Sequence, residues 1–289
     1  MRRREYAALI APSVIVMFGF LVIPLYRTIK WSLQNVDYGH PGTFVGLQNY
    51  VGALTDPRFG RAVLFTVGLT LTATAVLIVL GYIVATLINQ IGRVRPLVLG
   101  ILLISYVLPH VVGAAAFSWL FDSNFGGVVN YIITSLGGPE ILWFTDPWPN
   151  RLMICLNVVW SMLPFAMLII LAGLQGVPEE VIEAAEIDGA SSWKRHLHVI
   201  IPSIRGVLGF AILISIMDIL RVFDNLIPLA PQAVSIGNES IMLYIYNEAF
   251  REGDQNLGVG SAVSVLTIIL ILIMLFPFIR GVFREAKAR

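Results

Sequence analysis

The sequence is poor in charge and nearly free of cysteine. Of its 289 residues, 13% are charged, whereas a soluble domain contains about 25%. A chain with so few charges suits lipid as its main solvent. Its net charge of +1 gives no reason to expect nucleic acid as a partner. Cys155 is the only cysteine, which excludes an internal disulfide and a cysteine-based zinc site.

Motifs of enzymes and metal sites are missing as well. The sequence contains no GxSxG serine elbow, no HExxH and no GxxxxGKS or GxxxxGKT phosphate loop. His196 and His198 are two residues apart, which places them on different faces of a helix, and no acidic residue is spaced to complete a site. His110 follows Pro109 and could line a pore, although we favour a packed, neutral histidine. We expect no catalytic residue and no metal site in this chain.

What the sequence does contain is six long apolar segments. A helix that crosses a bilayer needs about 20 mostly apolar residues. The first segment follows Arg2-Arg3-Arg4 as in a signal peptide, but it is long and lacks a small-residue cleavage site, so we expect a retained span. Pro109 and Pro164 lie inside spans and predict kinks. The sequence therefore predicts an all-α membrane protein with spans at residues 7–26, 62–88, 97–120, 152–174, 206–229 and 257–279.

Basic residues near the span ends predict the orientation. With the N-terminus in the cytoplasm, 12 of the 19 lysines and arginines lie inside and 6 lie outside, while Arg221 falls within a span. We therefore expect both termini to be cytoplasmic. There is no internal repeat or long linker, so we expect residues 1–289 to form a single transmembrane domain.

A polar segment, residues 179–202, interrupts this apolar sequence between the fourth and fifth spans. Pro178 is a helix-start signal, and acidic residues follow it in the first turns, where the helix dipole favours them. Gly189 should end this helix, and residues 190–193 can begin a second one. Two interpretations stay open from the residues alone: an amphipathic helix lying on the membrane surface, or a docking element for another protein.

The polar segment resembles a family motif. Glu183-Ala184-Ala185-x-x-Asp188-Gly189-Ala190, followed by Val199-x-Ile201-Pro202, is similar to the EAA motif of permease subunits of binding-protein-dependent ABC importers. Val199 and Ile201 replace the usual Ile and Leu before the proline. The resemblance implies a type I importer permease fold, with residues of about 175–205 forming coupling helices in a cleft of the ATPase subunit. It implies that the coupling residues are Glu183, Ala184, Ala185, Asp188, Gly189, Ala190 and Trp193.

Other stretches resemble the carbohydrate-uptake branch of that family. They include residues 44–50, 108–130, 223–224 and 243–250, so the resemblance covers nearly the whole chain. One departure is at Leu229-Ala230-Pro231-Gln232, where the family often has a glycine-rich turn. The expected function is therefore a permease subunit that forms half of the path for a sugar or sugar-like solute.

The resemblance also implies partners and a location. Because the chain has no phosphate loop, ATP and Mg²⁺ are expected on a separate ATPase dimer, with no cofactor on this chain. Six spans are too few to enclose a sugar path, so a second, different permease subunit is expected. An extracytoplasmic solute-binding protein would deliver the sugar. The protein would be surrounded by membrane lipid in the inner membrane of a prokaryote.

Charged residues in the fifth segment are candidates for the substrate path. Asp218, Arg221 and Asp224 have i, i+3, i+6 spacing, which predicts one helix face, with Ser215 a turn earlier. Charged side chains in a span are costly and usually face a cavity or a partner. They would either line the path and bind sugar hydroxyls or form a buried structural ion pair. The same hypothesis includes three residues of the fourth span, an aromatic side chain beside hydrogen-bonding ones, although a tryptophan in a span is more often packing: Asn157, Trp160 and Ser161.

Two alternatives compete with the sugar permease. An ion-coupled secondary transporter would need an acidic residue that cycles a proton or sodium ion, and Asp218 is the only good candidate. Arg221, one turn away, would hold Asp218 ionised and oppose proton cycling. A permease for a polyol, glycerol-phosphate or oligopeptide is the other alternative, but a phosphate ester would call for more basic residues than Arg221 alone.

Overall fold

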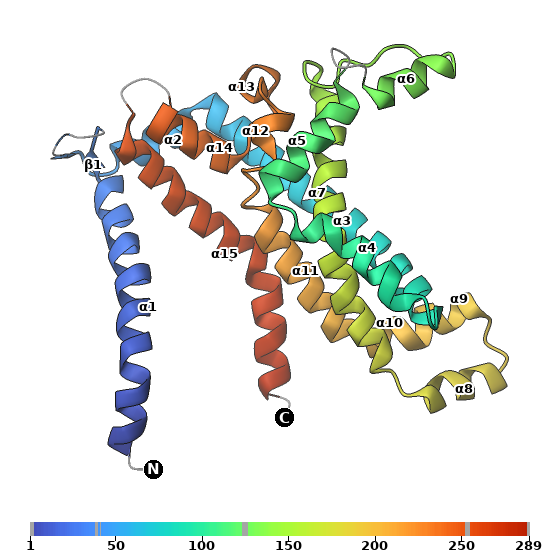
Figure 1. The fold of residues 1–289 in the computed structure, drawn as a ribbon. Helices are drawn as coiled ribbons and strands as arrows, with labels where there is room; N and C mark the ends of the chain where they lie inside the picture. Colours follow the sequence, from blue (N-terminus) through green and yellow to red (C-terminus); the bar gives the residue numbers. More distant parts are fainter. Residues whose placement is uncertain (1–2, 38–39, 41, 123–126, 252–254, 288–289) are drawn as a thin grey trace. The chain divides into compact units, whose positions relative to one another are not determined.

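The chain is described by a computed structural model that covers residues 3–37, 40, 42–122, 127–251 and 255–287. Among these residues, four helices are long and apolar enough to cross a membrane, and two further pairs of helices would each cross as one bent span (Figure 1). The long helices are α1 (Arg3–Ser32), α3 (Pro57–Gln90), α7 (Pro147–Gln175) and α15 (Leu257–Lys287). Five of the six predicted apolar segments lie on these helices or on a bent pair, and the segment 206–229 does so as far as Ile219, which confirms the all-α membrane architecture.

The chain divides into two compact units, which we describe separately. Unit 1 consists of Met1–Gly60 and Ile241–Ile273, and unit 2 of Arg61–Ser240 and Met274–Arg289. The single domain expected from the sequence stays a prediction. Unit 1 contains α1, β1 (Gln34–Asn35), β2 (Thr43–Phe44), α2 (Gln48–Thr55), α14 (Ile241–Tyr246) and η3 (Asn247–Arg251), with the first turn of α3 and most of α15.

Side-chain hydrogen bonds connect the short elements of unit 1. β1 and β2 pair antiparallel, with Gln34 opposite Phe44. The Asn49 amide donates to the backbone oxygen of Gln34 at 2.8 Å, which fixes α2 against β1. The Tyr244 hydroxyl donates to a carboxylate oxygen of Asp56 at 2.8 Å, which ties α14 to the start of α3. These polar contacts join segments that are far apart in the sequence, so a local sequence pattern does not predict them.

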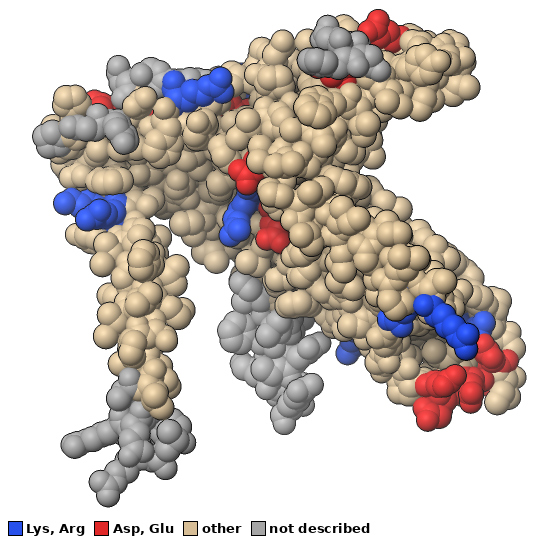
Figure 2. All heavy atoms as spheres, in the orientation of Figure 1, with Lys and Arg blue, Asp and Glu red and all other residues tan. Residues whose placement is uncertain are grey.

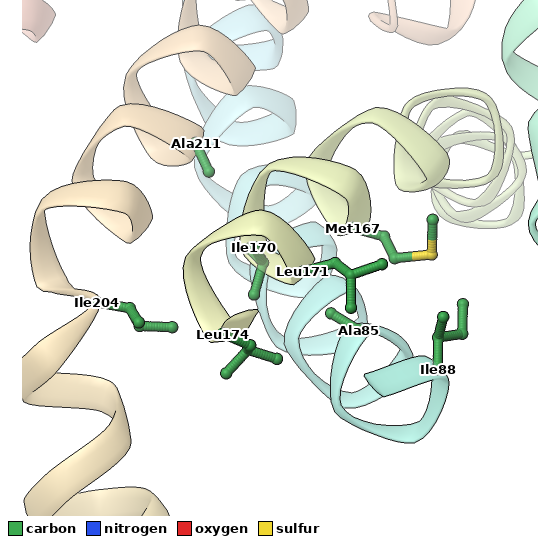
Figure 3. Close-up of a cluster of buried hydrophobic side chains, with 8 residues drawn as sticks. All are labelled: Ala85, Ile88, Met167, Ile170, Leu171, Leu174, Ile204 and Ala211. Carbon is green, nitrogen blue, oxygen red and sulfur yellow. The ribbon is translucent and has the colours of Figure 1, made fainter. Parts of the chain in front are cut away.

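Unit 2 contains the long helix α7, most of α3, the last part of α15 and, among the described residues, ten shorter elements. They are α4 (Arg95–Val107), α5 (His110–Phe121), α6 (Val128–Ser135), α8 (Glu179–Ile187), α9 (Ser192–Arg195), η2 (His196–Ile200), α10 (Ile201–Ser203), α11 (Arg205–Ile219), α12 (Leu226–Leu229) and α13 (Ala233–Ile236). Its apolar core joins α3, α7 and α11 (Figure 3) and consists of Ala85, Ile88, Met167, Ile170, Leu171, Leu174, Ile204 and Ala211.

Small residues let the helices of this core approach closely. A Cβ atom on Gly173 of α7 would lie 2.9 Å from the Val207 side chain of α11, closer than real Cβ atoms come. A Cβ on Gly81 of α3 would lie 3.4 Å from Ile170 of α7. Membrane helices associate through such close packing because lipid offers them no hydrophobic driving force.

The third predicted span is two helices rather than one kinked helix. α4 and α5 meet at an angle of 98° across a short break at Leu108 and Pro109. Proline lacks a backbone N–H and disfavours helical conformation in the residue before it. Leu108 accordingly has an extended ψ of 137°. Pro164, the other predicted kink site, lies within α7, whose residues form one helix.

The fifth predicted span is wrong in its second half. α11 ends at Ile219, so only Asp218 of the three charged residues is helical, and their predicted common helix face does not exist. The N–H groups of Arg221 and Val222 bond to carbonyls three residues back, which closes the helix in a tight turn. The Ser240 hydroxyl then donates to the Val222 carbonyl at 2.9 Å. Hydrogen bonds from elsewhere in the fold thus replace the helical ladder.

Candidate functional site

The polar segment between α7 and α11 forms two helices joined by a tight turn, as the sequence predicts. α8 begins after Pro178 and ends at Ile187, and Gly189 has a left-handed φ of +76°. The N–H of Gly189 donates to Glu186 at 2.9 Å and the N–H of Ala190 donates to Ala185 at 3.0 Å. This is the Schellman pattern of a helix end, in which glycine is favoured because it adopts the left-handed region without steric cost.

The segment exposes apolar side chains beside its charges. Ile187 is 86% exposed and Trp193 is 72% exposed, and no residue of α8, α9 or α10 is buried. Glu183 and Asp188 are exposed, and Glu186 forms an ion pair with Arg195 that joins the two helices. Figure 2 shows acidic and basic atoms gathered where Figure 1 places α8 and α9. Large exposed apolar side chains rimmed by charge mark a surface for a partner.

A contact that the sequence did not predict fixes the base of this segment. The hydroxyl of Tyr82, on α3, and Nδ1 of His196, at the start of η2, form a hydrogen bond of 2.6 Å. The two rings also meet edge to face, with centroids 5.8 Å apart. Because 114 residues separate the pair, the sequence offered no more than a tyrosine hydroxyl inside a mostly apolar helix as a signal. His196 therefore anchors the segment to a spanning helix.

A second candidate site is a cavity of about 250 Å³ next to the ends of α4, α5 and α11. In Figure 2 a small group of acidic and basic atoms, with uncharged residues beside it, lies in the region of α11 and α12. The cavity is lined by Leu77, Tyr106, His110, Met162, Phe165, Ile214, Ser215, Asp218, Arg221, Val222, Phe223, Asp224 and Asn225.

Four of the predicted path residues meet in this cavity. Ser215, Asp218, Arg221 and Asp224 all line it, even though the last two lie beyond the end of α11. The three charged side chains are exposed. Within the part of the chain that the structure describes, no ion pair joins Arg221 to either carboxylate. The cavity therefore presents unpaired charge to whatever fills it.

The aromatic surface of the cavity comes from residues that the sequence analysis did not select. Tyr106 and Phe165 line it with their rings stacked, 5.4 Å between centroids and 8° between planes. His110 is exposed and lines the cavity too, which corrects the expectation of a packed histidine. Its position follows from the break at Pro109, which directs the start of α5 toward the cavity.

The three predicted residues of the fourth span do not line the cavity. Asn157 is fully buried, and its side-chain oxygen accepts a hydrogen bond of 2.7 Å from Asn225, which does line it. Ser161 is buried and bonds to the backbone of its own helix. Trp160 packs beside Gly113 and Phe117 of α5. Asn157 thus supports the cavity wall from behind.

Comparison with known proteins assigns the family. Residues 77–286 match the family described as "Binding-protein-dependent transport system inner membrane component". The chain is 31% identical over 279 residues to the trehalose/maltose transport system permease protein MalF of Thermococcus litoralis, covering 96% of this chain and 93% of that protein. It is 31% identical over 281 residues to the trehalose transport system permease protein SugA of Mycobacterium tuberculosis, covering 96% and 88%.

A solved structure shares the fold. A chain in the crystal structure of a bacterial ABC transporter involved in the import of the acidic polysaccharide alginate matches with a TM-score of 0.82 at 20% identity, covering 97% of this chain and 95% of that one. The fold is that of a type I importer permease. The chain therefore belongs to the family of inner membrane components of binding-protein-dependent transport systems.

Proposed function

We propose that this protein is a permease subunit of an ATP-driven importer and that its cargo is a sugar or sugar-like solute. The observation that carries the proposal is the cavity in which unpaired Asp218, Arg221 and Asp224 face the stacked rings of Tyr106 and Phe165. A relative that is 31% identical bears the name of a trehalose/maltose permease, and another that of a trehalose permease.

The chemistry of the cavity fits a neutral carbohydrate. Sugar rings have apolar faces that stack on aromatic rings and hydroxyl edges that bond to charged groups. Two carboxylates against one guanidinium leave the cavity with an excess of negative charge, which disfavours a phosphate ester or another anionic solute. Ser215, which is buried and contributes to the wall, would add a hydroxyl for hydrogen bonding.

The segment of about 175–205 would couple this path to an ATPase on another chain. In this proposal Glu183, Asp188 and Trp193 contact the ATPase surface, while Gly189 fixes the angle between the two helices. Ala184, Ala185 and Ala190 keep the contact surface small enough for close approach. ATP and Mg²⁺ would be held by the ATPase dimer, whose closure would move the segment and the spans attached to it.

Two further partners complete the proposed importer. The cavity residues Asp218, Arg221 and Asp224 are exposed in this chain alone, which suits a path completed by a second permease subunit. A solute-binding protein would deliver the sugar on the side opposite the coupling segment. Both termini would then lie in the cytoplasm of a prokaryote, and the spans in its inner membrane.

Uptake by the complete importer in proteoliposomes tests the proposal. We expect uptake of labelled trehalose or maltose to require ATP inside the vesicle, and a proton or sodium ionophore to leave it unchanged. Uptake driven by an ion gradient without ATP would overturn the proposal in favour of a secondary transporter. Uptake of glycerol-phosphate in place of neutral sugars would overturn the cargo assignment.

The coupling residues are tested in the same vesicles. Glu183→Ala should lower sugar-stimulated ATP hydrolysis and the amount of ATPase subunit that co-purifies. Glu180→Ala is the matched control, because it removes an equally exposed carboxylate from the same helix. Equal coupling in both variants would contradict the docking role of Glu183.

A further inference from the structure

A second, larger cavity of unit 2 lies apart from the sugar path. It has a volume of about 620 Å³, within the range of about 300–1,000 Å³ that is typical of ligand sites. One helical stripe of α3 and one of α7 form its walls. None of its lining residues belongs to the polar segment or lines the cavity at Asp218. Apart from two arginines at one end, its lining is almost entirely apolar: Leu64, Phe65, Gly68, Leu69, Thr72, Pro147, Trp148, Cys155, Ile236 and Gly237.

The cavity is a groove because the two helices diverge. At Gly81 a Cβ atom would already touch α7, 3.4 Å from Ile170. At Gly68, about three and a half turns earlier, nothing lies within 4 Å of a Cβ atom. From Arg61 to Thr72 the groove follows α3 for 11 residues, or about 16 Å, which is close to half of a hydrocarbon core of about 30 Å. The groove therefore has the length of a single leaflet.

Arg61 and Arg151 converge at one end of this groove. Each is the fifth residue of its helix, and both approach Gly237. The Arg61 side chain lies 3.8 Å from where a Cβ of Gly237 would be, and Arg151 donates to the Gly237 carbonyl at 3.5 Å. Membrane-facing arginines at this depth would lie at the level of lipid headgroups.

Arg151 is held rigidly by neutral groups. Its Nε donates to the side-chain oxygen of Asn238 at 2.7 Å, and its guanidinium lies 4.8 Å from the ring centre of Trp148. Asn238 is fully buried and donates to the Pro147 carbonyl and to the Asn150 side chain. Guanidinium has five N–H donors, so this arrangement orients the group while leaving donors for another ligand.

Among the residues that the structure describes, no carboxylate compensates the positive charge at the groove. Arg58 is paired with Glu248 and Arg195 with Glu186. Among the described residues, by contrast, neither Arg61 nor Arg151 has an acidic partner, and the groove lining contains no acidic side chain. An apolar channel of leaflet length that ends at two unpaired arginines is complementary to one kind of molecule, an anionic lipid.

We propose that this groove binds an anionic phospholipid. One acyl chain would lie over Gly68 between α3 and α7, and the phosphate would accept hydrogen bonds from Arg61 and Arg151. A helix of a second permease subunit is the competing occupant, but an apolar helix would leave two arginines without a counter-charge. The lipid satisfies both the apolar and the charged parts of the groove.

Native mass spectrometry of the complete importer tests the proposal, with dioleoyl phosphatidylglycerol and dioleoyl phosphatidylcholine as separate probes. We expect one tightly bound phosphatidylglycerol at this groove and weaker phosphatidylcholine. The double variant Arg61→Gln, Arg151→Gln should bind phosphatidylglycerol roughly 30-fold more weakly, because each basic residue near a membrane surface contributes about 1 kcal/mol. Arg27→Gln, an exposed arginine near the end of α1, is the matched charge control.

A steric variant keeps the test independent of charge. Gly68→Leu should fill the groove and displace the lipid without disturbing the fold, because no atom lies within 4 Å of its Cβ position. Gly100→Leu on α4, where the space is equally open, should leave lipid binding unchanged. Unchanged phosphatidylglycerol affinity in the double arginine variant, or equal affinity for the two lipids, would overturn the proposal. So would cross-linking of a Gly68→Cys variant to the second permease subunit.

Discussion

Gly189 gives the sharpest prediction, because its role depends on backbone geometry alone. Its φ of +76° is in the left-handed region, where a residue with a Cβ pays roughly 1–2 kcal/mol. No atom lies within 4 Å of a Cβ at this position, so no steric clash adds to that cost. Gly189→Ala should therefore shift the equilibrium between the formed and the open turn toward the open state by about 5- to 30-fold.

Hydrogen exchange reports this shift directly. The N–H of Ala190 is protected by its bond to the Ala185 carbonyl, and it should exchange about 5- to 30-fold faster in Gly189→Ala. Gly189→Asn should show a smaller change, because asparagine tolerates the left-handed region. Gly206→Ala is the control, an exposed glycine with equal space but helical backbone. Unaltered exchange at Ala190 in Gly189→Ala would refute the reasoning.

Three further predictions concern other contacts. Asp218→Asn should raise the KM for sugar uptake tenfold or more, since a hydrogen bond to a charged group is worth about 1.5–3 kcal/mol; an unchanged concentration dependence would exclude Asp218 from the path. Tyr82→Phe removes the bond to His196 and should cost about 1 kcal/mol, seen as faster hydrogen exchange across residues 192–200. Burial, followed by the hydrogen bond to Asp56, raises the pKa of the Tyr244 phenol. Above about pH 10 the unfolded chain loses this proton while the folded chain keeps it, so the contribution of Tyr244 to stability is lost as the pH rises. Thermal unfolding of Tyr244→Phe should show a smaller loss of stability at alkaline pH.

The apolar spans were predictable because lipid imposes a simple rule on composition. A run of about 20 apolar residues predicts a span regardless of the residues that follow it. The turn at Gly189 was predictable for a similar reason, since a glycine after an acidic helix start carries its own local signal. Both features depend on residues that are close together in the sequence.

The end of α11 could not be predicted from local residues. Residues 206–229 are apolar enough to continue as a helix, but Ser240 bonds to the Val222 carbonyl and Asn157 to Asn225. These partners are 18 and 68 residues away. The aromatic surface of the cavity was missed similarly, because Tyr106 and Phe165 meet only in the folded chain.

The two interrupted spans have a consequence for water. α4 ends at Val107 and α11 at Ile219, and residues beside both ends line the same cavity. Asp218, Arg221 and Asp224 are exposed there, and a charged side chain is costly in hydrocarbon. In the proposed path these charged side chains must be hydrated when no sugar is present, so the empty path would hold water. The ends of that path must then be closed to prevent ions from leaking through the water.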